Sequence, residues 1–213
     1  MAEGPVGTAQ PRSRLRPLAT TMALLAGLLR LVPHAWNFTP MGAVGIFAGA
    51  RLPLLQAFAV PLGIMALTDT VLWLAKDWRP FDPFVYGSYA VCVLLGRTLT
   101  RSESPWRIMG TALLASVIFF LATNFGAWLE YKHLYARSLE GLMTSYVAGI
   151  PFYRGTFFGD LIYTAVLFGG YAWLTRRYFV SERVLVPSLV DSPGIDAPTL
   201  GESEAREVVS NHP

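Results

Sequence analysis

The sequence predicts an all-α protein, a polytopic membrane helix bundle of about six transmembrane helices with both termini in the cytoplasm. The chain has 213 residues, of which 53% are hydrophobic and only 15% are charged, and its mean hydropathy is +0.42. A typical soluble domain carries about 25% charged residues. The apolar residues also gather into runs of about 20, the length that crosses a bilayer. This composition excludes an ordinary soluble enzyme or a disordered protein, and a net charge of +3 without a continuous basic stripe excludes a nucleic-acid binder.

The first apolar region predicts two helices. Residues 18–50 contain a single charge, Arg30. The segment is too long for one membrane-spanning helix and short for two. Pro33 and Pro40 favour a break, because proline removes a backbone donor and clashes with the preceding helical turn. We therefore expect one helix at about 17–32 and a short one, which need not cross the membrane fully, at about 40–52.

The rest of the chain predicts four further spans and one interfacial helix. Asp69 is the only charge within the third predicted span, and Pro61 predicts a kink there. Residues 130–151 are mixed in character and predict a loop with a short interfacial helix at Leu139–Val147. The remaining spans are expected at about 53–75, 84–100, 108–129 and 152–175.

The bundle is expected to occupy residues 17–178, between two disordered polar tails at 1–16 and 179–213. Six crossings place both tails on one side. Leaving out Arg30 within the first helix and Arg206 near the end of the chain, that side carries ten Arg and Lys residues and the other side five. This excess predicts that the tails are cytoplasmic, in the inner (cytoplasmic) membrane of the cell. If the short second helix is re-entrant, the number of crossings falls to five and this argument weakens. The ten basic residues are Arg12, Arg14, Arg16, Arg51, Arg97, Arg101, Arg107, Arg176, Arg177 and Arg183.

Polar residues within the spans gather near the opposite, outer face. At a rise of 1.5 Å per residue, Asp69, Asn124 and Asp160 each lie roughly 8 to 12 Å from the outer end of their spans. Asn37 and Thr39 lie in the outer connection between the first two helices. Because polar groups inside a membrane are costly, this clustering predicts an outward-facing pocket.

Aromatic residues share helical faces with these polar groups, as the walls of small-molecule sites commonly do. The alternative is that the polar side chains only join helices through hydrogen bonds, which are common in membrane bundles. The predicted ligand-binding residues are Asn37, Thr39, Asp69, Trp73, Asn124, Trp128, Tyr153, Asp160 and Tyr163.

Small residues also recur at helical spacing. Ala19-x-x-x-Ala23 lies on the first helix and Gly45-x-x-x-Gly49 on the second, a spacing that lets two helix backbones approach closely. Such faces favour either packing within the bundle or docking of a partner membrane subunit. The sequence shows no nucleotide-binding loop, hydrolase or zinc-protease motif, and its histidines lack metal-ligand spacing, so we expect no metal and no cofactor.

Four sequence blocks resemble a family of bacterial six-helix membrane proteins of unassigned function, which is similar in layout to the S components of energy-coupling factor vitamin transporters. The resemblance implies an outward-facing small-molecule pocket and docking, through an Ala-x-x-x-Ala pattern matched here by Ala19 and Ala23, onto a transmembrane coupling subunit driven by ATPase subunits. The blocks are NFTPMGAVGIFAGA (37–50), PLGIMALTDTVLW (61–73), ATNFGAWL (122–129) and GIPFYRGTFFGDLIYTAVLFG (149–169).

The leading hypothesis is therefore a subunit that captures a small polar or aromatic solute. A membrane enzyme is the second hypothesis, in which Asp69 and Asp160 form a pair of carboxylates for acid–base work. It requires the two groups to approach within about 4–6 Å. The third is a structural scaffold in which the polar residues only pack the bundle.

Overall fold

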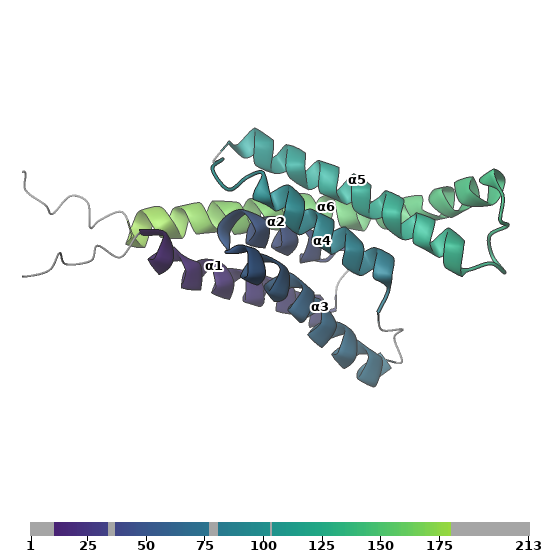
Figure 1. Cartoon of the computed structure of the whole chain (residues 1–213), viewed down its shortest axis with the longest axis horizontal. Coiled ribbons are helices and arrows are strands. Elements are labelled where there is room, and N and C mark those ends of the chain that lie inside the picture. Colours follow the sequence, from purple (N-terminus) through teal and green to yellow (C-terminus); the bar gives the residue numbers. More distant parts are fainter. Residues whose placement is uncertain (1–10, 34–36, 77–80, 103, 180–213) are drawn as a thin grey trace, which may run out of the picture.

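The computed structural model describes residues 11–33, 37–76, 81–102 and 104–179. Within these residues the chain forms six α-helices, a 3-10 turn and no strand (Figure 1). The predicted terminal tails therefore lie largely outside the described residues. In chain order the elements are α1 (Pro11–Leu28), η1 (Leu29–Leu31), α2 (Met41–Arg51), α3 (Leu54–Lys76), α4 (Pro83–Arg97), α5 (Pro105–Glu130) and α6 (Leu139–Tyr178).

The short helix α2 is the centre of the fold. It contacts each of the other five helices. All of its residues from Met41 to Ala50 are buried. A helix that is apolar on every side must be enclosed by other helices, and the sequence MGAVGIFAGA has no residue that would favour an exposed face.

Glycines allow α2 and α4 to pack backbone against backbone. A Cβ atom added to Gly49 would clash with the carbonyl oxygen of Val93, and one added to Gly96 would clash with that of Ile46. The predicted close-approach face at Gly45 and Gly49 is thus used inside the bundle. Substituting either contact glycine would push the two helices apart.

The carboxyl end of α2 is satisfied by a cation from α4. Nη1 of Arg97 donates hydrogen bonds to the carbonyl oxygens of Leu52, at 2.9 Å, and Gly49, at 3.3 Å. These carbonyls have no partner within the helix, and a positive charge is favourable at a helix carboxyl end. The buried end of α2 is therefore not left with orphaned acceptors.

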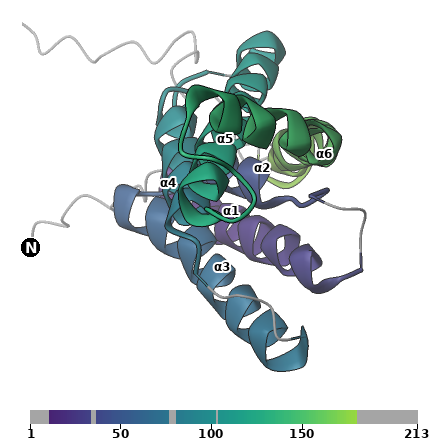
Figure 2. The same cartoon turned by 90° about the vertical axis from the view of Figure 1, so that its right-hand side faces the viewer.

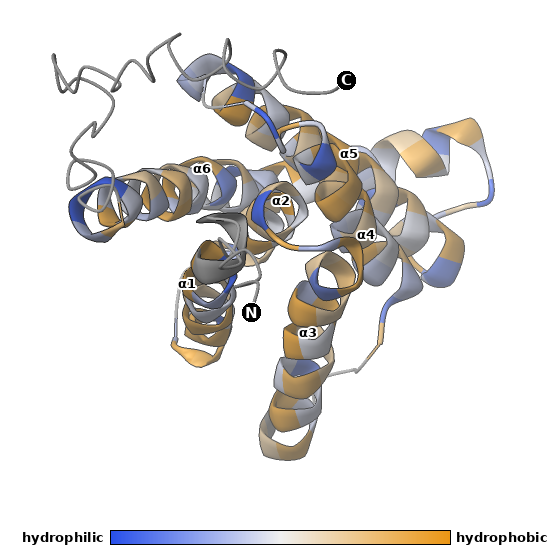
Figure 3. Ribbon diagram, turned by 60° about the vertical axis from the view of Figure 1, so that its left-hand side comes forward, coloured by the Kyte–Doolittle hydropathy of each residue, from blue (hydrophilic) through white to orange (hydrophobic). Residues whose placement is uncertain are grey.

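Three of the described helices are long and apolar enough to cross a membrane. They cover Leu54–Ala75, Pro105–Glu130 and Leu139–Tyr178. Large apolar side chains are widely exposed on them, including Leu55 at 82% and Leu74 at 76% of their full accessible area. Figure 3 shows α3 coloured mostly as hydrophobic along its length. Contiguous apolar surface of this kind marks contact with lipid or protein rather than water.

The helix boundaries differ from the sequence prediction at α1 and α6. Helix α1 begins at Pro11, before the predicted start at residue 17, and ends in the η1 turn. The predicted break before residue 152 is wrong, because α6 runs unbroken through Pro151. Ser145 on α6 donates to the carbonyl oxygen of Asn124 on α5 at 2.7 Å, so the part of α6 before the proline is tied to α5.

The start of α1 and the end of α6 lie at the same end of the bundle, on the left of Figure 1. The last turns of α3 and α5 and the first turn of α4 lie at the other end. Figure 2, which looks onto that second end, shows α3 leaning away from α5 and α6. The bundle is therefore more open at the end away from the described termini.

Gly96→Ala tests the backbone contact between α2 and α4. We expect it to lower the free energy of unfolding by about 1–3 kcal/mol, because the added methyl group must displace the Ile46 backbone. Gly110→Ala on α5 is the matched control, since a Cβ there meets nothing within 4 Å, and alanine is the better helix former. Thermal unfolding in detergent measures both. Equal stability of the two variants would contradict the packing described.

Candidate functional site

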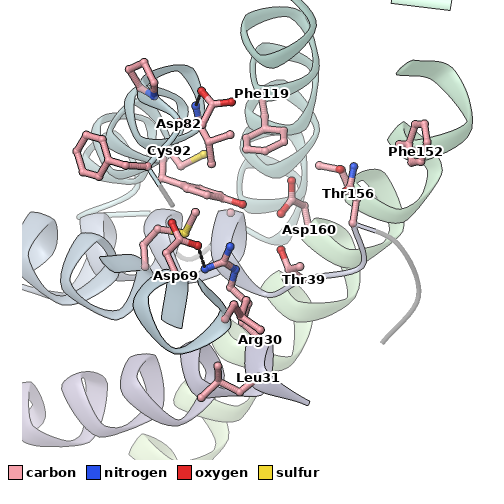
Figure 4. Close-up of a pocket in the computed structure, with 18 of the residues that line it drawn as sticks. Arg30, Leu31, Thr39, Asp69, Asp82, Cys92, Phe119, Phe152, Thr156 and Asp160 are labelled. Atoms are coloured by element: carbon pink, nitrogen blue, oxygen red, sulfur yellow. Dashed lines mark hydrogen bonds and ion pairs between the residues drawn. The ribbon is translucent and has the colours of Figure 1, made fainter. Parts of the chain in front are cut away.

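A cavity of about 800 Å³ is lined by η1, the end of α3 and the start of α4, together with residues of α2, α5 and α6. The end of α3 and the start of α4 lie at the end of the bundle away from the described termini (Figure 1). The cavity exists because α2 is short: eleven residues span about 16 Å, roughly half the hydrocarbon core of a bilayer. The longer helices continue past the start of α2, and the space above it is not filled. Its lining includes Arg30, Thr39, Gly42, Asp69, Tyr89, Phe119, Thr156 and Asp160 (Figure 4).

The floor of the cavity is the amino end of α2, and Asp160 of α6 lies against it. The carboxylate of Asp160 accepts a hydrogen bond from the backbone amide of Ala43. Gly42 is required beside it, because a Cβ there would clash with the carboxylate. The first amides of a helix lack internal partners and attract negative charge. Asp160 thus caps α2 from a neighbouring helix while lining the cavity.

An ion pair between Arg30 and Asp69 forms one side of the cavity. Nη1 of Arg30 lies 2.6 Å from Oδ1 of Asp69, and the two side chains are only 11% and 6% exposed. The same nitrogen donates to Oγ1 of Thr68 at 2.7 Å, and the hydroxyl of Tyr86 donates to Oδ2 of Asp69 at 2.9 Å. This network joins the end of α1 to α3 and α4. It neutralises two charges that would otherwise be costly to bury.

Aromatic rings form the opposing wall. Tyr89 of α4 is 6% exposed and its ring lies 5.2 Å from that of Phe119 on α5. The Tyr89 hydroxyl forms a hydrogen bond with the side chain of Thr39. At the mouth, Phe81 has a φ of 71°, unusual for a bulky residue, and its ring lies 4.5 Å from Tyr86. The cavity therefore combines an apolar wall with converging polar groups.

A second cavity of about 190 Å³ lies between α5 and α6 and shares Asn37 and Thr156 with the first. Asn124 and Tyr153 line it. Nδ2 of Asn124 donates to the Phe120 carbonyl of its own helix at 2.8 Å. The hydroxyl of Tyr153 on α6 lies 3.3 Å from that of Ser116 on α5. For Tyr153, the alternative of helix-joining contacts applies as well.

The structure places the predicted residues in three groups. Asn37, Thr39, Asp69 and Asp160 line the larger cavity, and Asn124 and Tyr153 line the smaller one with Asn37. The remaining three line neither. Trp73 is 47% exposed on α3. Trp128 donates to the Ala136 carbonyl at 2.8 Å, and Tyr163 stacks on Phe38 at 5.5 Å.

Ala19 and Ala23, the predicted docking residues, are completely buried within the described bundle. Their small side chains let α1 approach its neighbours closely, as small residues do in membrane bundles. They offer no surface to a partner subunit in this structure. This corrects the expectation from the Ala-x-x-x-Ala pattern.

The sequence interpretation missed Arg30, Tyr89 and Phe119 as cavity residues. A signal was present for Arg30, which is the only charge in residues 18–50, as Asp69 is in the next span. Lone opposite charges in successive spans indicate a pair, because neither is stable in the membrane alone. The two aromatic residues gave no comparable signal among the many apolar neighbours in their spans.

The carboxylates of Asp69 and Asp160 line one cavity but have different partners. Asp69 is held by Arg30 and Tyr86, and Asp160 by a backbone amide. No pairing of the two carboxylates with each other is seen among the described residues. No group of three or more His, Cys, Asp or Glu residues in this part of the chain is arranged to hold a metal ion.

The fold and the site together define a class: a protein whose described residues are all-helical, with three helices long and apolar enough to cross a membrane and a cavity lined by polar and aromatic residues. Residues 11–188 match the family described as a family of unknown function (DUF6580), and the chain belongs to this family. None of the curated proteins and none of the solved structures matches it.

Asp69→Asn tests the buried ion pair. The change leaves the Arg30 charge without a counter-ion, and we expect the free energy of unfolding to fall by about 3–5 kcal/mol. Arg30→Gln should cost a similar amount, whereas the double variant should cost less than the sum of the two. A double-mutant cycle from unfolding in detergent measures this coupling. Arg154→Gln, at an exposed position on α6, is the control. Additive effects would show that the two charges do not interact.

Proposed function

We propose that this protein is an integral membrane protein of the cytoplasmic membrane that binds a small polar or aromatic solute in the larger cavity. In this role it is the substrate-capture subunit of a transporter, similar in layout to an S component. The observation that carries the proposal is a polar cavity enclosed by an otherwise apolar bundle. Burying charged groups around an unfilled space is costly unless that space has a use.

The size and the lining of the cavity support a small-molecule ligand. Its volume of about 800 Å³ lies within the range of about 300–1,000 Å³ usual for such sites. Tyr89 and Phe119 supply flat apolar surfaces. Asp160, Thr39 and Thr156 supply hydrogen-bonding groups from other segments. A ligand in this position would lie among residues of η1, α2, α3, α4, α5 and α6.

The arrangement of the helices supports six crossings with both termini in the cytoplasm. Three helices are long and apolar enough to span, and α1, α2 and α4 pack against them. The start of α1 and the end of α6 lie at one end of the bundle, as an even number of crossings requires (Figure 1). The cavity then faces the cell exterior.

Transport would need an energy source outside this chain. In the proposed role, a transmembrane coupling subunit and ATPase subunits supply it. Because Ala19 and Ala23 are buried, such a subunit would dock on other residues. The lipid bilayer is the remaining partner, in contact with the exposed apolar faces of α3, α5 and α6.

Ligand binding can be screened with purified protein by thermal shift, using vitamins, amines, amino acids and nucleobases. We expect at least one compound to raise the melting temperature, since a ligand at 100 times its Kd stabilises by about 2.7 kcal/mol. Uptake of that compound should fall in a deletion strain. No shift with any compound, together with unchanged uptake, would support the scaffold hypothesis and overturn the proposal.

Thr156→Phe tests whether the ligand binds in the cavity. A phenyl ring at this position fills space that both cavities share, and we expect the ligand-induced shift to be lost. Thr144→Phe makes the same change at an exposed position on the same helix and should keep the shift. If both variants keep it, the ligand binds elsewhere. The melting temperature without ligand shows that each variant is folded.

Reporter fusions test the topology. Green fluorescent protein fused after Pro213 should fluoresce, because it folds in the cytoplasm, and alkaline phosphatase at the same position should be inactive. Alkaline phosphatase inserted in the α5–α6 connection, at residues 131–138, should be active. The reverse pattern would show that the cavity faces the cytoplasm.

A further inference from the structure

The cavity has an excess of negative charge. Among its described lining residues, one side chain is basic, Arg30, and four are acidic: Asp69, Asp82, Glu130 and Asp160. The chain as a whole does not share this bias, since it has 17 basic and 14 acidic residues. The excess therefore belongs to the cavity. A low-dielectric site with net negative charge attracts cations and repels anions.

The one arginine is already engaged. Its Nη1 atom binds both Asp69, at 2.6 Å, and Thr68, at 2.7 Å. The pair leaves no net positive charge to recognise an anion. It also holds the Asp69 carboxylate on the far side of the cavity from Asp160 in the view of Figure 4.

Asp160 is the carboxylate placed to meet a ligand. It is 3% exposed, lies near the middle of α6 and lines the cavity. Its carboxylate accepts a hydrogen bond from the backbone amide of Ala43. A helix amino end supplies the equivalent of about half a positive charge, which does not fully balance a carboxylate. An anionic ligand group cannot use this helix end, because Asp160 already occupies it.

The groups around Asp160 suit a positively charged nitrogen. Thr39 and Thr156 flank it and offer hydroxyl oxygens as acceptors (Figure 4). The rings of Tyr89 and Phe119 stand close together on the same cavity. Aromatic faces attract cations, and more strongly where water is excluded.

We propose that the ligand of this cavity is an organic cation, a protonated or quaternary amine on an apolar or aromatic body, whose charged nitrogen binds Asp160. This inference rests on the proposed function and narrows its substrate class. The carboxylate supplies the counter-charge, the two threonines accept hydrogen bonds, and the aromatic wall contacts the apolar body. Neutral and anionic solutes of the same shape do not gain from the counter-charge of the carboxylate.

The test compares compounds that share a ring and differ in charge. Tryptamine, tryptophol and indole-3-acetate form one set; tyramine, tyrosol and 4-hydroxyphenylacetate form another, and choline is added as a quaternary amine. Binding to the purified full-length chain is measured by thermal shift and titration at neutral pH and low salt. We expect a cationic compound to bind at least about tenfold more tightly than its neutral partner, and the anions not to bind.

Asp160→Asn removes the charge and keeps an acceptor for the Ala43 amide, since asparagine caps helices about as well as aspartate. We expect it to weaken binding of the cation at least about tenfold and to abolish the preference over the neutral compound. Glu140→Gln, an exposed carboxylate on the same helix outside the cavity, should change neither. If Asp160→Asn does not fold, the charge series on the unaltered protein decides alone.

The outcomes separate the two proposals. If the compounds that bind, in this series and in the wider screen, are neutral or anionic, the inference of a cationic ligand is overturned. The proposal that the cavity binds a solute then still stands. A cation that binds equally well to Asp160→Asn would also overturn it, because the nitrogen would then lie elsewhere. No binding by any compound of any charge would overturn the proposed function itself.

Discussion

A short helix buried at the centre of the bundle is the constraint on which the rest of the structure depends. Helix α2 contacts all five other helices, and its ends lie inside the protein rather than at a membrane surface. Backbone amides and carbonyls at such ends must find partners, since neither lipid nor apolar side chains supply them. Asp160 on α6 satisfies an amide at one end, and Arg97 on α4 satisfies carbonyls at the other. Each charge has the sign that the helix dipole favours.

The cavity follows from the same constraint. Because α2 reaches only about half the thickness of a bilayer, the longer helices enclose unfilled space above its amino end. The network of Arg30, Asp69 and Tyr86 joins α1, α3 and α4 beside this space, where close apolar packing is absent. Asp160 therefore has two roles that share one position: it caps a helix, and it brings negative charge to the cavity.

Much of the helix arrangement was accessible from the sequence, and the exceptions have physical causes. The short helix at 40–52 was predicted from two prolines and lies at Met41–Arg51. The continuity of α6 was not, because proline usually disrupts a helix, whereas membrane helices with packed neighbours tolerate it and α6 packs on α5. The expectation that Asp69 and Asp160 lie at similar depth agrees with their lining one cavity. Depth alone could not show that Trp73, Trp128 and Tyr163 face away, because it carries no information on rotation about the helix axis.

The sequence by itself determined the helical class, the long apolar helices and the collection of polar residues near one end, because these depend on local composition and on the rise of a helix per residue. The tertiary structure decided which polar groups meet. Arg30 and Asp69 are 39 positions apart, and Gly42 and Asp160 lie on different helices, so their contacts depend on how the helices rotate and pack around α2. The same packing buried Ala19 and Ala23, which the sequence had offered as a docking face. Side chains in a bundle acquire their partners from neighbouring helices, and helix rotation is set by the sum of many contacts rather than by any local pattern.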